Sequence, residues 1–97
     1  IKISLEKSCI LDLFSGVGSF GLECLSRGSK EVVFIENYIK VLPILKKNLL
    51  NLNSVKNYKI IEANIYDEKT LSSLNQKFDI IEVNKVKKIK ASIFAKS

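Results

Sequence analysis

Five residues near the start of the chain have the types and the spacing of a nucleoside-binding loop. They are Asp12, Gly16, Gly18, Gly21 and Glu36. Glycines spaced in this way, between a strand and a helix, let the backbone approach a ligand closely. An acid about 20 residues after the first glycine is placed to accept the hydroxyls of a ribose. The pattern predicts a ligand that contains a nucleoside, and a tight turn with a purely structural role is the alternative.

Asp12 separates two classes of ligand that such a loop can hold. A pyrophosphate is anionic, and a carboxylate a few ångströms away would oppose its binding by about 4 kcal/mol at an effective dielectric constant near 20. S-adenosylmethionine has no phosphate and carries a sulfonium cation, which a nearby acid stabilises. The sequence therefore favours this cationic ligand over NAD. A carboxylate that accepts N–H groups of the loop itself would also account for Asp12.

Alternating strands and helices are expected to position these residues. Apolar, β-branched runs predict strands over residues 9–14, 31–36, 58–62 and 78–83. Apolar spacing of three to four residues predicts helices over residues 19–27, 38–52 and 67–74. Such alternation with short loops implies an α/β fold with a parallel sheet and right-handed crossovers.

Single residues mark the ends of the three predicted helices. Gly28 is a stop signal for the first helix. Pro43 falls within the first turn or two of the second helix, where proline is tolerated. Asp67 is placed to cap the third helix, and Glu68 in its first turn favours the helix dipole.

The composition is that of one globular domain. The 97 residues are 46% hydrophobic and 27% charged, and no apolar run approaches the roughly 20 residues that cross a bilayer. No membrane contact is expected, and the cytoplasm is the default location. Cys9 and Cys24 have no metal spacing and the chain has no histidine, so we expect two buried thiols in a reducing compartment and no metal.

The basic character of the chain has two explanations. A net charge of +6 suits a polyanionic partner such as RNA. However, every basic residue except Arg27 is a lysine, and the chain is also rich in Ile and Asn. These three residue types have AT-rich codons, so the base composition of the genome alone would produce the same charge.

The stretch DLFSGVGSFGLECLSRGSKEVVFIEN, residues 12–37, resembles the first motifs of a bacterial methyltransferase family. Members of this family use S-adenosylmethionine to modify guanine N2 of 16S ribosomal RNA. The resemblance runs from about Leu5 to Val83. The LSRG segment at 25–28 and the pair Glu36-Asn37 are similar to this family in particular and not only to methyltransferases in general. It implies a partial Rossmann-like sheet of the class I methyltransferase type, with about four strands in the order 3-2-1-4.

The resemblance also implies roles for individual residues toward S-adenosylmethionine. Asp12 and the loop from Phe14 to Gly18 would hold its methionine part, and Glu36 would accept the two ribose hydroxyls. Where the family usually has an acid near the adenine, the uncharged Asn64 would accept a hydrogen bond from the adenine amine, which implies weaker binding. The implied cofactor-binding residues are Asp12, Phe14, Ser15, Gly16, Gly18, Gly21, Glu36, Asn37, Asn64 and Ile65.

The sequence departs from the family after the fourth predicted strand. Members carry Asp or Asn there, then two prolines and an aromatic residue that stacks on the flipped base. Here the segment at 84–87 reads NKVK, so Asn84 is in register as a catalytic candidate while the prolines and the aromatic residue are missing. The resemblance implies a methyltransferase acting on ribosomal RNA or a small-subunit assembly intermediate, or the cofactor-binding fragment of one. A catalytically inactive nucleoside- or RNA-binding remnant and an NAD-binding half-domain are the alternatives.

Residues 1–84 are expected to form the cofactor-binding unit, followed by a basic tail over residues 85–97. The tail has apolar residues at helical spacing between lysines, which is typical of a solvated amphipathic helix. A basic face for RNA, or a segment that is no native element, are the alternatives. A sheet ordered 3-2-1-4 leaves the fourth strand as an open apolar edge at Ile80, Ile81 and Val83, which predicts self-association unless the basic tail covers that edge.

Overall fold

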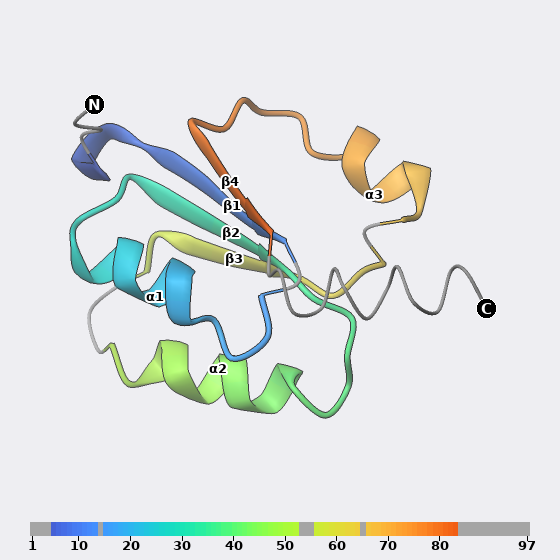
Figure 1. Ribbon diagram of the computed structural model, residues 1–97, viewed down its shortest axis with the longest axis horizontal. Coiled ribbons are helices and arrows are strands. Elements are labelled where there is room, and N and C mark those ends of the chain that lie inside the picture. Colours follow the sequence, from blue (N-terminus) through green and yellow to red (C-terminus); the bar gives the residue numbers. More distant parts are fainter. Residues whose placement is uncertain (1–4, 14, 53–55, 65, 84–97) are drawn as a thin grey trace.

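The computed structural model of the protein describes residues 5–13, 15–52, 56–64 and 66–83. Within them, four strands form one parallel sheet in the order β3-β2-β1-β4 (Figure 1). The strands are β1 (Cys9–Leu13), β2 (Glu31–Ile35), β3 (Tyr58–Ile61) and β4 (Ile80–Val83), and a short 3-10 helix, η1 (Leu5–Lys7), precedes them. The predicted α/β class and strand order are confirmed, and each strand lies within its predicted range.

Helices lie on both sides of the sheet. α1 (Ser19–Ser26) and α2 (Leu42–Leu50) lie on one side, and α3 (Glu68–Ser72) lies on the other (Figure 1). Because side chains alternate along a strand, the sheet supplies a separate apolar layer to each side. The core cluster between the sheet and the helices α1 and α2 is the larger of the two. It consists of Ile10, Val32 and Phe34 from the sheet, Cys24 and Leu25 from α1, and Leu45 and Leu49 from α2. On the other side Leu11, Val33 and Ile35 pack against Leu74 and Phe78, which follow α3.

α2 begins later than predicted. Its first residue is Leu42, not Tyr38, although Leu42, Leu45 and Leu49 form the expected buried face. Residues 38–41 form a turn instead, in which the N–H of Val41 donates to the carbonyl of Tyr38 at 3.0 Å. A helix started at residue 38 would need an N–H at Pro43, which proline lacks, whereas at the first turn of α2 none is needed.

The two predicted capping signals that flank the other helices are confirmed. Gly28 follows α1 with φ +87°, and the N–H groups of Gly28 and Ser29 donate to the carbonyls of Leu25 and Cys24. This pair of bonds is a Schellman motif, and only glycine adopts its left-handed position without strain. At α3, the carboxylate of Asp67 accepts the N–H of Lys69 at 3.0 Å.

α3 ends at Ser72, two residues before its predicted end at Leu74. The Ser72 hydroxyl donates to the carbonyl of Lys69 and the Ser73 hydroxyl to that of Thr70. Serine side chains that bond the preceding carbonyls compete with continued helix, which accounts for the early end.

The two cysteines differ in burial. Cys24 on α1 is buried as predicted, but Cys9 is only partly buried because it opens β1 at the amino edge of the sheet; both are free thiols. Among the described residues, none of the helices is long and apolar enough to cross a membrane. The predicted unit boundary at residue 84 and the basic tail at 85–97 lie outside the described residues.

Candidate cofactor site

The glycine loop connects β1 to α1 as a tight turn. Gly16 and Gly18 have φ values of +59° and +85°, which place both in the left-handed region. The N–H of Gly18 donates to the carbonyl of Ser15 at 2.8 Å, and the Ser15 hydroxyl donates to the carbonyl of Asp12 at 2.6 Å. The loop therefore has a fixed shape that depends on glycine at two positions.

Glu36 lies directly after β2 and holds the first half of this loop. Glu36 is 2% exposed, and its Oε1 accepts the N–H of Gly16 at 2.8 Å. Its Oε2 accepts the N–H groups of Asn37 and Tyr38, each at 3.0 Å. A ribose hydroxyl would have to share these oxygens with three backbone donors, so the predicted ribose role of Glu36 stays a prediction.

Asp12 holds the second half of the loop from the end of β1. Asp12 is 3% exposed, and its Oδ2 accepts the N–H of Gly21 in α1 at 3.2 Å. The structural explanation of Asp12, a bond to the loop's own N–H, is therefore observed. That bond occupies one of about four acceptor positions of a carboxylate, so Asp12 can hold the loop and also face a ligand.

Two of the glycines are also required by packing. A Cβ at Gly21 would overlap the ring of Phe34 and lie 3.0 Å from Oδ2 of Asp12. A Cβ at Gly18 would overlap Cδ1 of Leu45 in α2. α1 and α2 therefore pack closely against the sheet next to the glycine loop. In nucleotide-binding motifs the third glycine, here Gly21, allows this close packing of helix and strand.

A residue of α2 that the sequence pattern did not single out as a site residue completes the support of the loop. The side-chain amide of Asn48 donates to the carbonyl of Val17 at 2.9 Å. Val17 lies between the two left-handed glycines, so this bond fixes the tip of the turn. The segment KKNL, residues 46–49, resembles the second helix of the methyltransferase family described above, and this resemblance is the signal in the sequence that points to Asn48.

The carboxylate of Asp12 lies in an environment that disfavours its charge. The pKa of Asp12 is raised to about 7, chiefly by burial; the hydrogen bond from Gly21 lowers it, and the charges of Glu82 and Glu36 raise it. Glu82 lies beside Asp12 because the two residues are paired in the register of β1 and β4. Burial and the charge of Asp12 also raise the pKa of the Cys24 thiol, which keeps it neutral.

The remaining predicted site residues are less closely joined to the loop. Asn37 is exposed and contributes its N–H to Glu36. Asn64 is exposed beyond β3, where its Oδ1 accepts the N–H of Tyr66 at 2.9 Å in a turn of the chain. Its role toward the adenine amine stays a prediction. Phe14, Ile65 and Asn84 lie outside the described residues.

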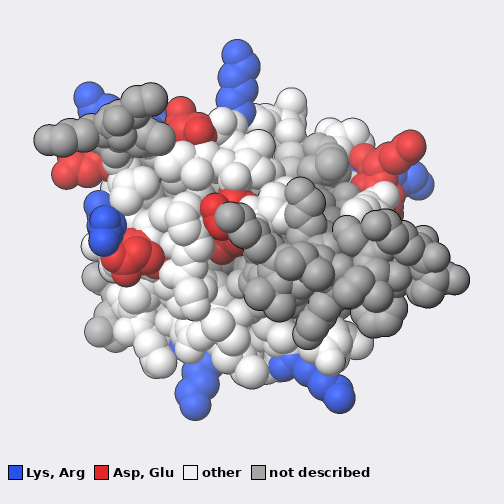
Figure 2. All heavy atoms as spheres, in the orientation of Figure 1, with Lys and Arg blue, Asp and Glu red and all other residues white. Residues whose placement is uncertain are grey.

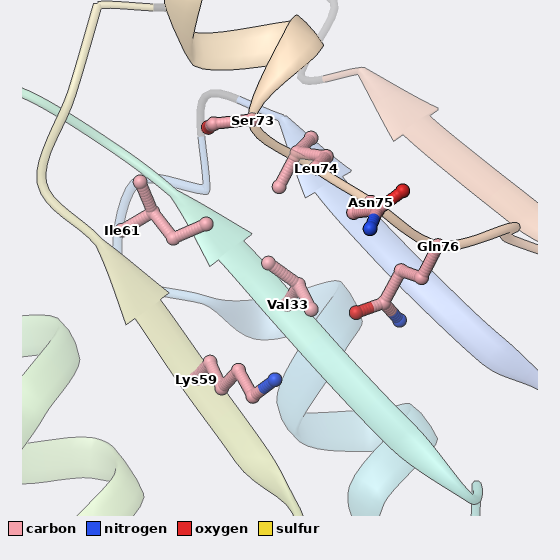
Figure 3. A pocket seen from close by; sticks show the side chains of 7 residues that line it. All are labelled: Val33, Lys59, Ile61, Ser73, Leu74, Asn75 and Gln76. Atoms are coloured by element: carbon pink, nitrogen blue, oxygen red, sulfur yellow. The ribbon is translucent and has the colours of Figure 1, made fainter.

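A cavity of about 270 Å³ lies away from the glycine loop, on the side of the sheet that carries α3 (Figure 3). It is lined by Val33, Lys59, Ile61, Ser73, Leu74, Asn75 and Gln76. Two of its polar residues are engaged structurally, because Gln76 donates to Glu31 at 2.8 Å and the amine of Lys59 lies 3.7 Å from the same carboxylate. These contacts join β2, β3 and the segment after α3.

The surface charge does not mark an RNA-binding face in the viewed orientation. Figure 2 shows the described lysine and arginine side chains projecting singly around the rim of this face, with acidic side chains between them. The expectation that a basic surface binds RNA therefore gains no support from this face of the described residues.

Comparison with known proteins identifies the family. A family model described as "Conserved hypothetical protein 95" matches residues 1–84. Ribosomal RNA small subunit methyltransferase D of Buchnera aphidicola subsp. Baizongia pistaciae is 39% identical over 77 residues, which are 79% of this chain and 38% of that protein. The protein of the same name from Haemophilus influenzae is 38% identical over 72 residues, which are 74% of this chain and 35% of that protein. The chain thus spans well under half the length of these curated relatives.

Solved structures share the fold. A ribosomal protein L11 methylase from Lactobacillus delbrueckii subsp. bulgaricus superposes with a TM-score of 0.65 at 19% identity, over 82% of this chain and 38% of that one. The predicted partial Rossmann-like fold of the class I methyltransferase type is confirmed. Since the family model matches most of its length, the chain belongs to the Conserved hypothetical protein 95 family, and its curated relatives are ribosomal RNA methyltransferases.

Proposed function

We propose that this chain forms the S-adenosylmethionine-binding part of a methyltransferase that acts on ribosomal RNA. The choice of cofactor rests on the hydrogen bonds that the glycine N–H groups already donate within the protein. Those of Gly16 and Gly21 donate to the carboxylates of Glu36 and Asp12, and that of Gly18 donates to a backbone carbonyl. The donors that a dinucleotide's pyrophosphate would need are therefore already bound, two of them to acids.

Electrostatics supports the same choice. A pyrophosphate against this loop would lie beside two buried carboxyl groups, and an ionised carboxylate about 4 Å from a phosphate repels it by about 4 kcal/mol at an effective dielectric constant near 20. A sulfonium cation in the same place is attracted by a similar amount. The donor set of Asp12 and Glu36 thus fits S-adenosylmethionine and disfavours NAD.

The residues of the loop would hold the cofactor without rearrangement. Asp12 would face the cationic methionine part, and the loop at 15–18, fixed by Glu36 and Asn48, would leave the backbone open to close approach. When bound, S-adenosylmethionine supplies an activated methyl group. In this site the protein's contribution is to position that group and to balance its charge.

We further propose the exocyclic N2 of a guanine as the methyl acceptor, with Asn84 accepting a hydrogen bond from that amine. The names of the curated relatives support small-subunit ribosomal RNA as the substrate. The choice of N2 rests on the likeness of residues 12–37 to that family, and on Asn84 being in register with its catalytic position.

Calorimetry tests the cofactor. The purified chain is titrated in parallel with S-adenosylhomocysteine and with NAD, and we expect heat of binding from the first only. Asp12→Asn is expected to weaken binding of S-adenosylmethionine. An Asp12→Asn protein that binds NAD more tightly than the unmodified chain would show that the cofactor is wrong.

A methylation assay tests the reaction. Unmodified small-subunit ribosomal RNA and its assembly intermediates are incubated with the chain and labelled S-adenosylmethionine, and the modified nucleoside is identified after digestion. Label in N2-methylguanosine supports the proposal, and label in another nucleoside contradicts the choice of acceptor. Cofactor binding without any label would identify the chain as a catalytically inactive remnant.

A further inference from the structure

Glu82 lies next to Asp12 at the carboxyl end of the sheet. Asp12 of β1 and Glu82 of β4 are partners in the parallel register, and neighbouring strands lie roughly 4.8 Å apart. Side chains at one register position point to the same face of a sheet. Ile80, two residues before Glu82, packs against the core beneath α1 and α2, so Glu82 lies on the same side as Asp12.

Among the described residues, neither Asp12 nor Glu82 forms an ion pair. Asp12 and Glu36 are buried, and Glu82 is partly buried. Among the described residues, the ion pairs lie elsewhere: Arg27 with Glu23, Lys46 with Glu62, and Lys59 with Glu31. Neither a hydrogen bond nor an ion pair joins Glu82 to any of these residues.

Glu62 provides an instructive contrast. It also follows the end of a strand, β3, but its carboxylate lies 3.3 Å from the amine of Lys46 in α2. At the end of β4 the fold supplies no such partner within the described residues. Two adjacent carboxylates that are partly or fully withdrawn from water repel each other and are costly unless a positive charge is added. The arrangement has the form of an incomplete salt bridge.

We propose that Glu82 is a second anionic residue of the cofactor site, which together with Asp12 makes the site distinguish S-adenosylmethionine from S-adenosylhomocysteine by charge. This inference rests on the proposed function. In the transfer, the lone pair of the acceptor amine forms a bond to the methyl carbon, the carbon–sulfur bond breaks, and sulfur keeps that electron pair. The amine then loses a proton to solvent.

The sulfur is cationic before this step and neutral after it. Two acids beside it therefore attract the substrate form of the cofactor and lose that attraction once the methyl group has gone. Glu82 is a specificity-determining residue in this scheme, because it acts on the charge of the bound molecule and not on the acceptor. A site with both acids is therefore expected to release S-adenosylhomocysteine more readily than a site with one acid.

The test compares two ligands that differ in that charge. Dissociation constants for S-adenosylmethionine and S-adenosylhomocysteine are measured by calorimetry for the unmodified chain and for Glu82→Gln. One partly exposed charge acting at short range changes affinity by about five- to tenfold. We expect Glu82→Gln to weaken S-adenosylmethionine by this factor and to leave S-adenosylhomocysteine within about twofold, while Glu82→Lys weakens the first ligand further.

Glu6→Gln is the matched control, because it removes the same charge from η1 at the amino end of the sheet, where Glu6 is exposed. Its ratio of affinities is expected to equal that of the unmodified chain. If both Glu82 variants keep the unmodified chain's ratio of affinities for S-adenosylmethionine and S-adenosylhomocysteine, the inference is wrong. Binding of both ligands by the unmodified chain would still support the proposed cofactor site. Failure of the unmodified chain to bind either ligand overturns the proposed function with it. Circular dichroism melting of each variant establishes that it is folded.

Discussion

Replacing Asp12 by Asn is expected to stabilise the ligand-free protein at neutral and alkaline pH. The pKa of Asp12 rises from 3.8 to about 7 on folding, chiefly through burial. At about 1.4 kcal/mol per pH unit, this difference corresponds to about 4 kcal/mol. Domains of this size have total stabilities of roughly 5–15 kcal/mol, so the ionised carboxylate costs a large part of the stability.

The sign of the effect follows from linkage. Because folding raises the pKa, the folded state holds the proton more tightly, and this contribution to stability is complete below pH 3.8 and is lost as pH rises to about 7. Among the described residues, the titratable groups near Asp12 are Cys24 from α1, Glu36 after β2 and Glu82 from β4. Asn carries no proton equilibrium, so the variant lacks this pH dependence.

Urea unfolding measured from pH 4 to pH 9 provides the test. The free energy of unfolding of Asp12→Asn minus that of the unmodified chain should rise by up to about 4 kcal/mol between pH 4 and pH 7 and then level off. Asp79→Asn is the control, because the exposed Asp79 carboxylate also accepts one backbone N–H, from Cys9 at 2.8 Å. A difference curve for Asp12→Asn that is as flat as the control would refute the reasoning.

Three further changes test the packing, the loop and the sheet edge. Gly21→Ala should destabilise the fold by about 2–4 kcal/mol, because its methyl group would overlap the Phe34 ring. Gly28→Ala meets no atom closer than 3.7 Å and should destabilise the fold by about 1 kcal/mol. Urea unfolding measures both changes in stability. Glu36→Gln leaves fewer acceptors for three backbone N–H groups and should cost about 2–3 kcal/mol, measured in the same way; an unchanged stability would show that these bonds contribute nothing. The unmodified chain should self-associate through β4, where Ile81 is 58% exposed, and Ile81→Lys should give a monomer in sedimentation; a clean monomer before the change would contradict this expectation.

The topology could be predicted from the sequence because local and long-range signals agree. Continuous apolar runs such as that before Gly16 read as buried parallel strands, and Gly28 and Asp67 act within one turn of the helices they bound. The start of α2 could not be predicted in this way. It depends on residues 38–41 forming a turn whose first N–H is held by Glu36, which no helical periodicity reveals.

The candidate site was only partly visible in the sequence. The spacing of Asp12 and Glu36 from the glycines predicted that both acids border the loop, but not that each accepts a glycine N–H. Glu82 became a neighbour of Asp12 only through the register of β1 and β4. The signal for it was the alternation of β4, which places residue 82 on the same side as the core residue Ile80. A pairing between strands 70 residues apart is not encoded in any local window.

The bonds from Glu36, Asp12 and Asn48 to the glycine loop have a consequence for kinetics. A loop that is already immobilised in the free protein loses little conformational freedom when a small molecule arrives, so association should be a single fast step without a slower ordering phase. The same bonds connect the glycine loop to β1, β2 and α2, the elements that form the hydrophobic core beneath it. Substitutions of Glu36 or Asn48 that loosen the turn should therefore be detected first as a lower melting temperature, before any change in selectivity.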